Sequence, residues 1–450
     1  MKKYDVVVVG GGPAAIITAV TTRKNYPDKS VVLIRDKEKV LIPCGIPYIY
    51  GTLGEVEKDI MGDAPLKGAN VDIIIDRAEK IDKENKILTL NSGETFNYDK
   101  LVLATGSIPF NLNITGQDKK GVHYITKDFE KLSQLKKEID SVNNIVIIGG
   151  GFIGVEFADE IAKLKNKKVT IVELKDKILS AAFDDEFCEI GEEKAKSSGI
   201  EIITGVKVEE IKGSDKVEKI KLSNGKEIDA DLVLIAVGGS ANAKLAKDAG
   251  LLTGKCGAIW TDEYMRTTEP SIFAVGDCAE KKDFFTRKPL NVMLASIATA
   301  EARIAGINLY QLKVLRANYG TISIFSTSIA NHAFAAAGLT EKIAIKEGFN
   351  IITGNFETMD RHPGVMPDAS KLKVKLVFSK ESGILLGGQI TGGVSVGEII
   401  NLIGFAIQSK LTATELITFQ IGTHPKLTAA PTVYPVIKAA EDALAKMVKS

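Results

Sequence analysis

Residues 145–164 read IVIIGGGFIGVEFADEIAKL, and residues 169–173 read VTIVE. An apolar run that ends in a glycine-rich turn, a helix-compatible stretch and a second apolar run predict a strand, a helix and a second strand. Gly149, Gly151 and Gly154 fit the pattern G-x-G-x-x-G. Small residues at these places permit a tight turn, close approach of a pyrophosphate and packing of the helix on the strand. The stretch therefore predicts a dinucleotide-binding unit.

The charged residues of this unit bear on which dinucleotide it takes. Glu173 ends the second strand, where a carboxylate accepts hydrogen bonds from the 2′-hydroxyl of NADH and repels a 2′-phosphate. NADH is therefore favoured, while Lys175 leaves NADPH open. Glu156 falls in the first turn of the predicted helix, where it suits the helix dipole or, alternatively, lies beside the bound nicotinamide.

The same order of elements occurs at the start of the chain. Residues 4–9 form an apolar run, a GGGPAA turn follows, and VVLI at residues 31–34 supplies the second strand. Gly10, Gly12 and Ala15 fit the same fingerprint, whose last position accepts alanine. Two such units predict an α/β protein with two Rossmann-type domains.

The first unit departs from the pattern at the end of its second strand. Arg35 stands where an acidic residue usually holds the adenosine ribose, and Asp36 follows it. We assign the ribose contact to Asp36, with Arg35 near the adenosine phosphates as the alternative.

One of the four cysteines lies in a distinctive segment. Cys44 stands in LIPCGIPYIYG, shortly after the first unit, where a helix could start. Amides at a helix N-terminus stabilise a thiolate and lower the pKa of the thiol, which favours a nucleophilic and redox role. The alternative is a small buried hydrophobe, which is the interpretation we give to Cys188, Cys256 and Cys278.

Bulk composition narrows the functional classes. The chain has 450 residues, 45% of them hydrophobic and 26% charged, which predicts a folded protein of two or three domains. The formal charge of +1 and the interleaving of lysines with acids predict neither a nucleic-acid partner nor a membrane partner. No cysteine pair has metal-ligand spacing, so we expect no metal site and a reducing, cytoplasmic location. From about Thr321 the pattern changes to alternating strands followed by two helical segments, which predicts an α+β domain.

Taken together, GGGPAA, YDKLVLATGS (98–107), GGGFIGVEFA, VTIVE and TEPSIFAVGDCAE (268–280) resemble the pyridine nucleotide-disulfide oxidoreductase superfamily over nearly the whole chain. The resemblance implies an FAD domain in two pieces, an inserted NAD(P)H domain, and a C-terminal interface domain that makes a homodimer. The expected bounds are 1–112 with 245–320, 113–244, and 321–450, respectively.

The resemblance also implies the residues that hold the cofactors. Asp277 matches the aspartate that binds the ribityl and phosphate region of the flavin, and Thr105 and Gly106 match a turn that lines the flavin. Glu156 would then lie beside the nicotinamide and the flavin. The expected cofactor-binding residues are Gly10, Gly12, Pro13, Ala15, Arg35, Asp36, Pro43, Ala78, Thr105, Gly106, Gly149, Gly151, Phe152, Ile153, Gly154, Glu156, Glu173, Gly238, Asp277 and Ala295.

Within the superfamily, the chain looks like the single-cysteine branch. Ile49 stands where two-cysteine members carry the second sulfur, and PCGIPY is similar to the coenzyme A-disulfide reductase form. Pro13 replaces the histidine that peroxidases and many oxidases carry in the first glycine turn. We therefore expect reduction of a low-molecular-weight disulfide, persulfide or polysulfide, with coenzyme A disulfide as one candidate.

Two other functions stay open. One is an NADH oxidase that reduces oxygen through a Cys44 sulfenic acid. The other is a flavin-bearing redox sensor or electron-carrier partner with slow turnover.

A histidine near the C-terminus is a second catalytic candidate. His424-Pro425 is similar to the histidine-proline pair that glutathione reductase places across the dimer interface as an acid-base catalyst, but Ala429 replaces the usual glutamate. His424 is thus either a proton donor to a leaving thiol or a packing residue. Arg361 and His362 are further candidates for the substrate channel.

Overall fold

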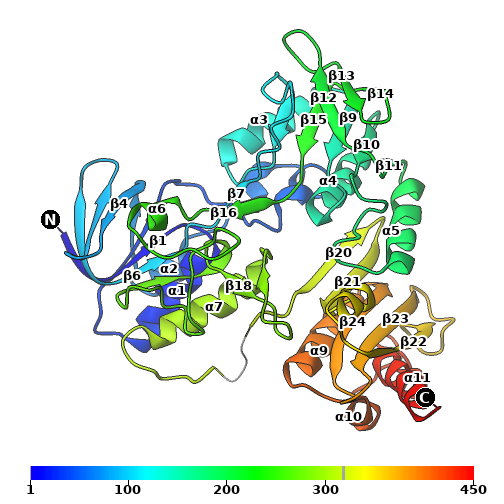
Figure 1. Ribbon diagram of the computed structural model, residues 1–450. Coiled ribbons are helices and arrows are strands. Elements are labelled where there is room, and N and C mark those ends of the chain that lie inside the picture. The colour runs from blue at the N-terminus through cyan, green and yellow to red at the C-terminus, as the bar shows by residue number, and fades with distance from the viewer. Residues whose placement is uncertain (1, 317–319, 450) are drawn as a thin grey trace.

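The computed structural model describes residues 2–316 and 320–449, which form three lobes, each built on its own sheet (Figure 1). Two lobes carry parallel strands flanked by helices, and the C-terminal lobe carries an antiparallel sheet. The predicted class of two Rossmann-type units with a C-terminal α+β domain is confirmed. No helix in the described part of the chain is long and apolar enough to cross a membrane.

The first lobe has the amino-terminal strand in the middle of its sheet. The strand order is β3-β2-β1-β6-β5-β4, and β17, from much later in the chain, pairs with β6. Helix α7 packs beside α1, so a late segment also covers this sheet (Figure 1). The elements are β1 (Lys2–Val9), α1 (Pro13–Asn25), β2 (Val31–Arg35), α2 (Ala64–Gly68), β3 (Asp72–Ile75), β4 (Ala78–Asp82), β5 (Ile87–Leu90), β6 (Thr95–Leu103), α6 (Lys244–Asp248), β17 (Ile272–Ala274) and α7 (Ala295–Asn308).

The second lobe repeats the arrangement around β9. The order is β11-β10-β9-β15-β8, all parallel, and a three-stranded antiparallel sheet β12-β13-β14 extends this lobe. β15 and all of β9 after its first residue are buried and apolar, and β10 after its first residue is buried with Thr170 as its one polar residue, as is typical of strands covered on both faces. The elements are β8 (Val122–Tyr124), α3 (Phe129–Ser141), β9 (Asn144–Ile148), α4 (Phe152–Ala162), β10 (Lys168–Val172), α5 (Asp185–Ser197), β11 (Glu201–Ile203), β12 (Val208–Lys212), β13 (Lys219–Leu222), β14 (Glu227–Asp229) and β15 (Leu232–Ile235).

The third lobe is a five-stranded antiparallel sheet in the order β20-β21-β24-β23-β22. Helices α9 and α11 pack on it and bury their apolar stripes. The elements are β20 (Ile324–Ile329), β21 (His332–Gly338), α8 (Glu341–Lys346), β22 (Ile351–Met359), β23 (Lys371–Ser379), β24 (Leu385–Gly392), α9 (Val396–Gln408), α10 (Ala413–Thr418) and α11 (Pro435–Lys449).

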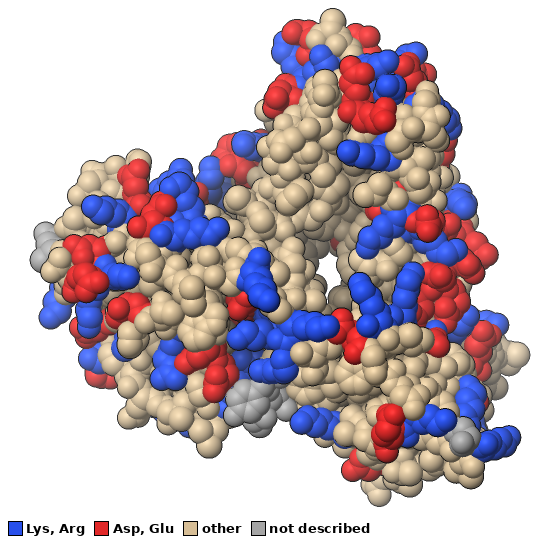
Figure 2. Space-filling model, in the orientation of Figure 1, with Lys and Arg blue, Asp and Glu red and all other residues tan. Residues whose placement is uncertain are grey.

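Short elements connect the lobes. Strands β7 and β16 pair with each other. In β7 the chain leaves the first lobe, and in β16 it returns to that lobe. On the face shown in Figure 2, acidic and basic side chains are interspersed over most of the surface. The remaining elements are η1 (Ile46–Ile49), η2 (Val56–Asp59), β7 (Ser107–Pro109), β16 (Gly239–Ala241), η3 (Gly276–Cys278), β18 (Lys281–Lys282), β19 (Pro289–Leu290) and η4 (Pro431–Val433).

A buried ion cluster fastens the second lobe to the third. The ammonium of Lys375, on β23, lies 3.0 Å from Asp184, which immediately precedes α5. It also lies 2.6 Å from Glu186 and 2.5 Å from Glu341. Although burial opposes the charge, these carboxylates hold the pKa of Lys375 above its usual range. Gln389 donates to Asp184 at 2.6 Å, so this carboxylate is fully engaged.

Replacement of Lys375 by methionine should destabilise the protein, because Asp184 would remain buried without its cation. The expected loss in the free energy of unfolding is about 3–5 kcal/mol. Lys371→Met, on the same strand, is the matched control, because its ion pair with Glu357 is exposed and should cost less than about 1 kcal/mol. Urea unfolding followed by circular dichroism measures both variants, and equal midpoints would contradict the assignment.

Candidate active site

The turn that opens α4 has the geometry that the fingerprint requires. Gly149 has φ +110°, in a region that favours glycine. A Cβ on Gly154 would lie 1.9 Å from the carbonyl oxygen of Gly149, so only glycine lets the helix pack here. Gly151, the N-cap of α4, has open space at its Cβ position. The carboxylate of Glu173 accepts the N–H groups of Gly150 at 2.6 Å and Lys175 at 2.8 Å, which fixes it at the end of β10 beside this turn.

The first fingerprint turn is built in the same way. Gly10 has φ +136°, and a Cβ there would lie 2.2 Å from the carbonyl oxygen of Ala104. Gly12, the N-cap of α1, faces open space, and Pro13 follows in the first turn of the helix. Ala15 is fully buried at the packing position.

Arg35 has a partner that the sequence did not indicate. Its guanidinium binds the Asp63 carboxylate through two hydrogen bonds of 2.6 and 2.9 Å, and it donates to the Glu38 carbonyl at 2.9 Å. Its side chain also lies against Gly11. Asp36 is exposed. Arg35 is therefore held beside the first glycine turn with its charge already paired.

Asp277 lies on a turn that a buried ion pair supports. Lys281 and Glu301 are 3.0 Å apart, Lys281 donates to the Gly276 carbonyl at 2.6 Å, and Glu301 accepts the Gly276 N–H at 2.9 Å. Asp277 in turn accepts hydrogen bonds from Ser107 at 2.8 Å and from Lys127 at 3.2 Å.

The other predicted cofactor residues lie in several elements of the first two lobes. The hydroxyl of Thr105 donates to the Asn242 carbonyl at 2.6 Å. Gly106 and Gly238 have φ +71° and +93°, with open space where a side chain would stand. Ala295 is the first residue of α7, and Ala78 is the first residue of β4. Phe152 opens α4 and packs on Phe325, while Ile153 and Pro43 lie near the surface.

Cys44 lies on an exposed turn between β2 and η1. Ile49, at the position of a second sulfur in two-cysteine relatives, is fully buried. Cys188 and Cys278 are buried, whereas Cys256 is exposed. The charges of Glu156, Lys127 and Asp277 act on the exposed Cys44 thiol.

The expected lowering of the Cys44 pKa is wrong. The helix that follows, η1, is a single 3-10 turn and provides only a weak dipole. Burial of the thiol by its surroundings raises the pKa of Cys44, although one side is open to solvent. Glu156 raises it further, Lys127 opposes this, and the carboxylates of Asp277 and Asp59 add to the increase. The polypeptide therefore favours the protonated thiol.

Glu156 lies at the junction of all three lobes. It accepts a hydrogen bond of 2.7 Å from the hydroxyl of Thr327, on β20 of the C-terminal lobe. Burial raises the pKa of Glu156 to about 7, against the effect of that hydrogen bond. The same carboxylate acts on Tyr48, whose pKa burial raises to about 12. The charge of Glu156 also acts through space on Cys44. Its predicted place beside the nicotinamide and the flavin stays a prediction.

The segment after Cys44 is clamped onto α4. Glu160, which is 1% exposed, accepts the backbone N–H of Thr52 at 2.6 Å and its hydroxyl at 3.0 Å. Lys163 forms an ion pair of 2.5 Å with the same carboxylate. Tyr50 packs on Phe157 with ring centroids 5.2 Å apart. One helix therefore carries the dinucleotide turn at its start and the Cys44 segment further along.

His424 is not brought to Cys44 within the described chain. It lies in an exposed loop, and its Nδ1 accepts the N–H of Lys426 at 3.2 Å. The loop is bound to His362, which donates its N–H to the Pro425 carbonyl at 3.1 Å. Arg361 forms an ion pair with the buried Asp360 at 3.1 Å. These residues form a surface cluster on the C-terminal lobe.

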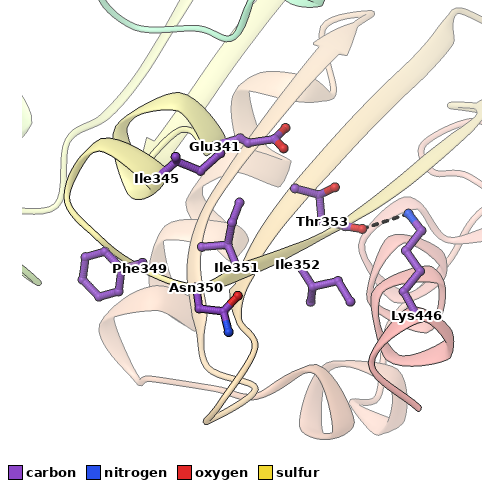
Figure 3. Close-up of a pocket in the computed structure, with 8 residues that line it drawn as sticks. All are labelled: Glu341, Ile345, Phe349, Asn350, Ile351, Ile352, Thr353 and Lys446. Carbon is purple, nitrogen blue, oxygen red and sulfur yellow. Dashed lines mark hydrogen bonds between the residues drawn. The ribbon is translucent and has the colours of Figure 1, made fainter. Parts of the chain in front are cut away.

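A hollow of about 520 Å³ also lies on the C-terminal lobe, between the start of β22, α8 and α11 (Figure 3). In Figure 3 the ammonium of Lys446 points to the Thr353 carbonyl, with which it forms a hydrogen bond of 2.9 Å. None of the predicted site residues lines this hollow. It is therefore separate from the candidate active site.

Several site residues escaped the sequence analysis. Lys127, Thr327 and Asp63 contact Asp277, Glu156 and Arg35, respectively, yet no local motif contains them. Only the polar contacts of the folded chain identify them.

Comparison with known proteins gives two family matches. The pyridine nucleotide-disulphide oxidoreductase family matches residues 4–302, and the dimerisation domain of that family matches residues 324–433.

Similar proteins include sulfur reductases and oxidases. The chain is 32% identical to an NADH oxidase of Methanocaldococcus jannaschii, over 98% of this chain and 99% of that protein. It is 32% identical to an NAD(P)H coenzyme A polysulfide/persulfide reductase of Pyrococcus horikoshii, over 87% of this chain and 88% of that protein. The structure of an NAD-dependent persulfide reductase from A. fulgidus superposes with a TM-score of 0.91 at 31% identity, over 99% of this chain and 84% of that one.

The matched family implies FAD and NAD(P)H, and the residues present fit both groups. Open space stands at the Cβ positions of Gly12 and Gly106 in the first lobe, and of Gly151 and Gly238 by the second. Each N-cap glycine starts a helix, whose N-terminal amides suit a pyrophosphate.

The raised pKa of Glu156 predicts that this residue costs stability at alkaline pH. Below about pH 4.5 the carboxyl is protonated whether the chain is folded or unfolded, so it has no effect. As pH rises toward about 7, only the unfolded chain releases the proton, and the folded state loses up to about 3 kcal/mol. Glu156→Gln should therefore be more stable than the natural protein at pH 8, and the two should converge at pH 4.5. Thermal unfolding tests this, with the exposed Glu193→Gln as control; parallel curves at both pH values would contradict it.

Proposed function

Because this chain belongs to the pyridine nucleotide-disulfide oxidoreductase family, we propose that it is an FAD-dependent reductase that uses NADH to reduce a low-molecular-weight disulfide, persulfide or polysulfide through Cys44. One observation carries the proposal: the exposed Cys44 thiol feels the charge of Glu156, and the buried Ile49 stands in place of a second sulfur. A lone thiol must form its disulfide with an external sulfur compound.

The chain's own residues provide the binding and the nucleophile. Gly10, Gly12 and Asp277 would hold FAD, and Gly149, Gly151 and Glu173 would hold the nicotinamide dinucleotide. When bound, FAD supplies the two-electron chemistry that links a nicotinamide to a thiol. The Cys44 thiolate attacks one sulfur of the substrate, forms a mixed disulfide and displaces the other sulfur as a thiolate, which takes up a proton. Two further electrons and one proton cleave the mixed disulfide, which regenerates the Cys44 thiolate and releases the second thiol. Overall, NADH and one proton are consumed for each disulfide reduced to two thiols.

Two features favour sulfur over oxygen as the acceptor. Pro13 provides no acid-base group at the first turn. Two of the similar proteins described above are named as persulfide reductases. The Methanocaldococcus jannaschii relative is named as an NADH oxidase, so oxygen reduction through a Cys44 sulfenic acid is the second candidate. The dimerisation domain supports a homodimer.

Cys44→Ser should bind FAD and accept hydride from NADH yet lose disulfide turnover by about a thousand-fold or more, because the attacking sulfur is gone. Cys256→Ser, the other exposed cysteine, is the matched control and should keep full turnover. The assay follows NADH oxidation with coenzyme A disulfide, polysulfide or oxygen as acceptor.

The choice of acceptor separates the candidates. Cys44-dependent oxidation of NADH by oxygen alone would establish the oxidase. Negligible turnover with every acceptor would favour a redox sensor or electron carrier. Full disulfide turnover by Cys44→Ser would refute both Cys44 mechanisms.

Glu173→Ala should raise the KM for NADH about ten-fold, because the carboxylate would both orient the Gly150 turn and accept from the ribose. The same change should reduce the preference for NADH over NADPH, since the charge that repels a 2′-phosphate is lost. The exposed Asp176→Ala is the control. Steady-state kinetics with both nucleotides measure the ratio, and an unchanged ratio would show that Glu173 does not select the cofactor.

A further inference from the structure

Asp59 is a buried acid without a full set of partners. It ends η2 and is 2% exposed, and its Oδ2 has no hydrogen-bond partner among the described residues. Burial of a carboxylate without compensating hydrogen bonds is costly and is rare in folded proteins. Such a group beside a reactive side chain calls for a functional explanation.

The backbone holds Asp59 against the Cys44 turn. Ile42 donates its N–H to the Asp59 carbonyl at 2.9 Å, and Met61 donates to the Val40 carbonyl at 2.8 Å. An antiparallel bridge joins Leu41 to Ile60. The two segments are thereby aligned, with Asp59 opposite the residues that lead into Cys44.

The side chain of Asp59 occupies the space of the missing side chain at Gly45. A Cβ on Gly45 would lie 1.8 Å from Oδ1 and 2.8 Å from Cγ of Asp59. The backbone of Gly45 is ordinary, with φ −84° and ψ −18°, so its conformation does not demand glycine. The glycine after Cys44 is thus explained by the carboxyl group of Asp59.

We propose that Asp59 is a positioning residue for Cys44, whose buried carboxyl fills the space beside Gly45 and fixes the Cys44–Gly45 turn, and whose charge is one of those that face the thiol. No bond forms between them: Cys44 releases one proton to solvent, and an ionised Asp59 opposes that release through space. The inference rests on the proposed role of Cys44.

Several charged groups around Cys44 contribute to its reactivity, so the effect of Asp59 must be measured over the pH range in which Asp59 changes charge. The groups that face the thiol are Glu156 on α4, Asp277 on η3, Asp59 on η2 and Lys127 before α3, and Tyr48 on η1 is also close. Burial raises the pKa of Asp59 to about 6, so this carboxyl is neutral in mild acid and charged at neutral pH. Its influence on Cys44 should therefore develop as pH rises through 6.

The test is the rate at which iodoacetamide alkylates Cys44 in the FAD-loaded protein, read by peptide mass spectrometry. The exposed Cys256 in the same sample is the internal reference. Asp59→Asn keeps the shape of the side chain and removes the charge, so it should raise the Cys44 rate relative to Cys256 by about two-fold to three-fold at pH 7.5. Glu57→Gln, an exposed change on the same 3-10 turn, should leave the ratio unaltered.

A ratio unchanged in folded, FAD-containing Asp59→Asn would overturn the proposal. If that variant does not fold, the pH dependence of Cys44 alkylation in the natural protein provides the test. The logarithm of its Cys44 rate should fall below a line of unit slope above pH 6, and this deviation should persist in Glu156→Gln. A straight line through that range in Glu156→Gln would refute the inference. Alkylation needs no electron acceptor, so these results are independent of whether disulfide turnover is found.

Discussion

The carboxylate of Glu160, on helix α4, binds the polypeptide segment that follows Cys44. The arrangement of the candidate active site depends on this contact. Three donor groups, from Thr52 and Lys163, satisfy an acid that is almost completely buried. Because α4 begins at the second glycine turn, one helix sets the spacing between the residues predicted to bind the nicotinamide dinucleotide and the thiol. Glu156 projects from the same helix and meets Thr327 of the C-terminal lobe. All three lobes therefore contribute to one site through a single element.

The charged groups of this site disfavour the thiolate form of Cys44. Three carboxylates act on Cys44 against one lysine, and the protein surrounding the thiol adds to their effect. A thiol held protonated is less exposed to oxidation than a thiolate, because thiolate character governs susceptibility. Glu156, with its pKa raised to about 7, changes charge in the range where such an enzyme works. The reactivity of Cys44 thus depends on the protonation of its neighbours rather than on the weak dipole of η1.

Local patterns predicted the fold and the two glycine turns of the candidate site. The apolar strands, the glycine turns and Glu173 are encoded within short stretches, so periodicity and spacing were enough to identify both Rossmann-type units and the α+β domain. The pKa of Cys44 was predicted in the wrong direction, because the following helix proved to be one turn long and the nearby acids come from distant segments. The partner of Arg35 was missed for the same reason, since Asp63 belongs to no recognisable motif. Long-range polar contacts require the folded chain.

The ion cluster at Lys375 also has a consequence for how the protein is made. Asp184 leaves the ribosome long before Lys375 and Gln389, the residues that neutralise it and donate to it. The second lobe can form its parallel sheet early, but the surface around Asp184 stays hydrated until β23 and β24 have been synthesised. Completion of the second lobe is therefore tied to the arrival of the C-terminal sheet. Nascent chains that stop short of β23 would carry this lobe with its docking surface open.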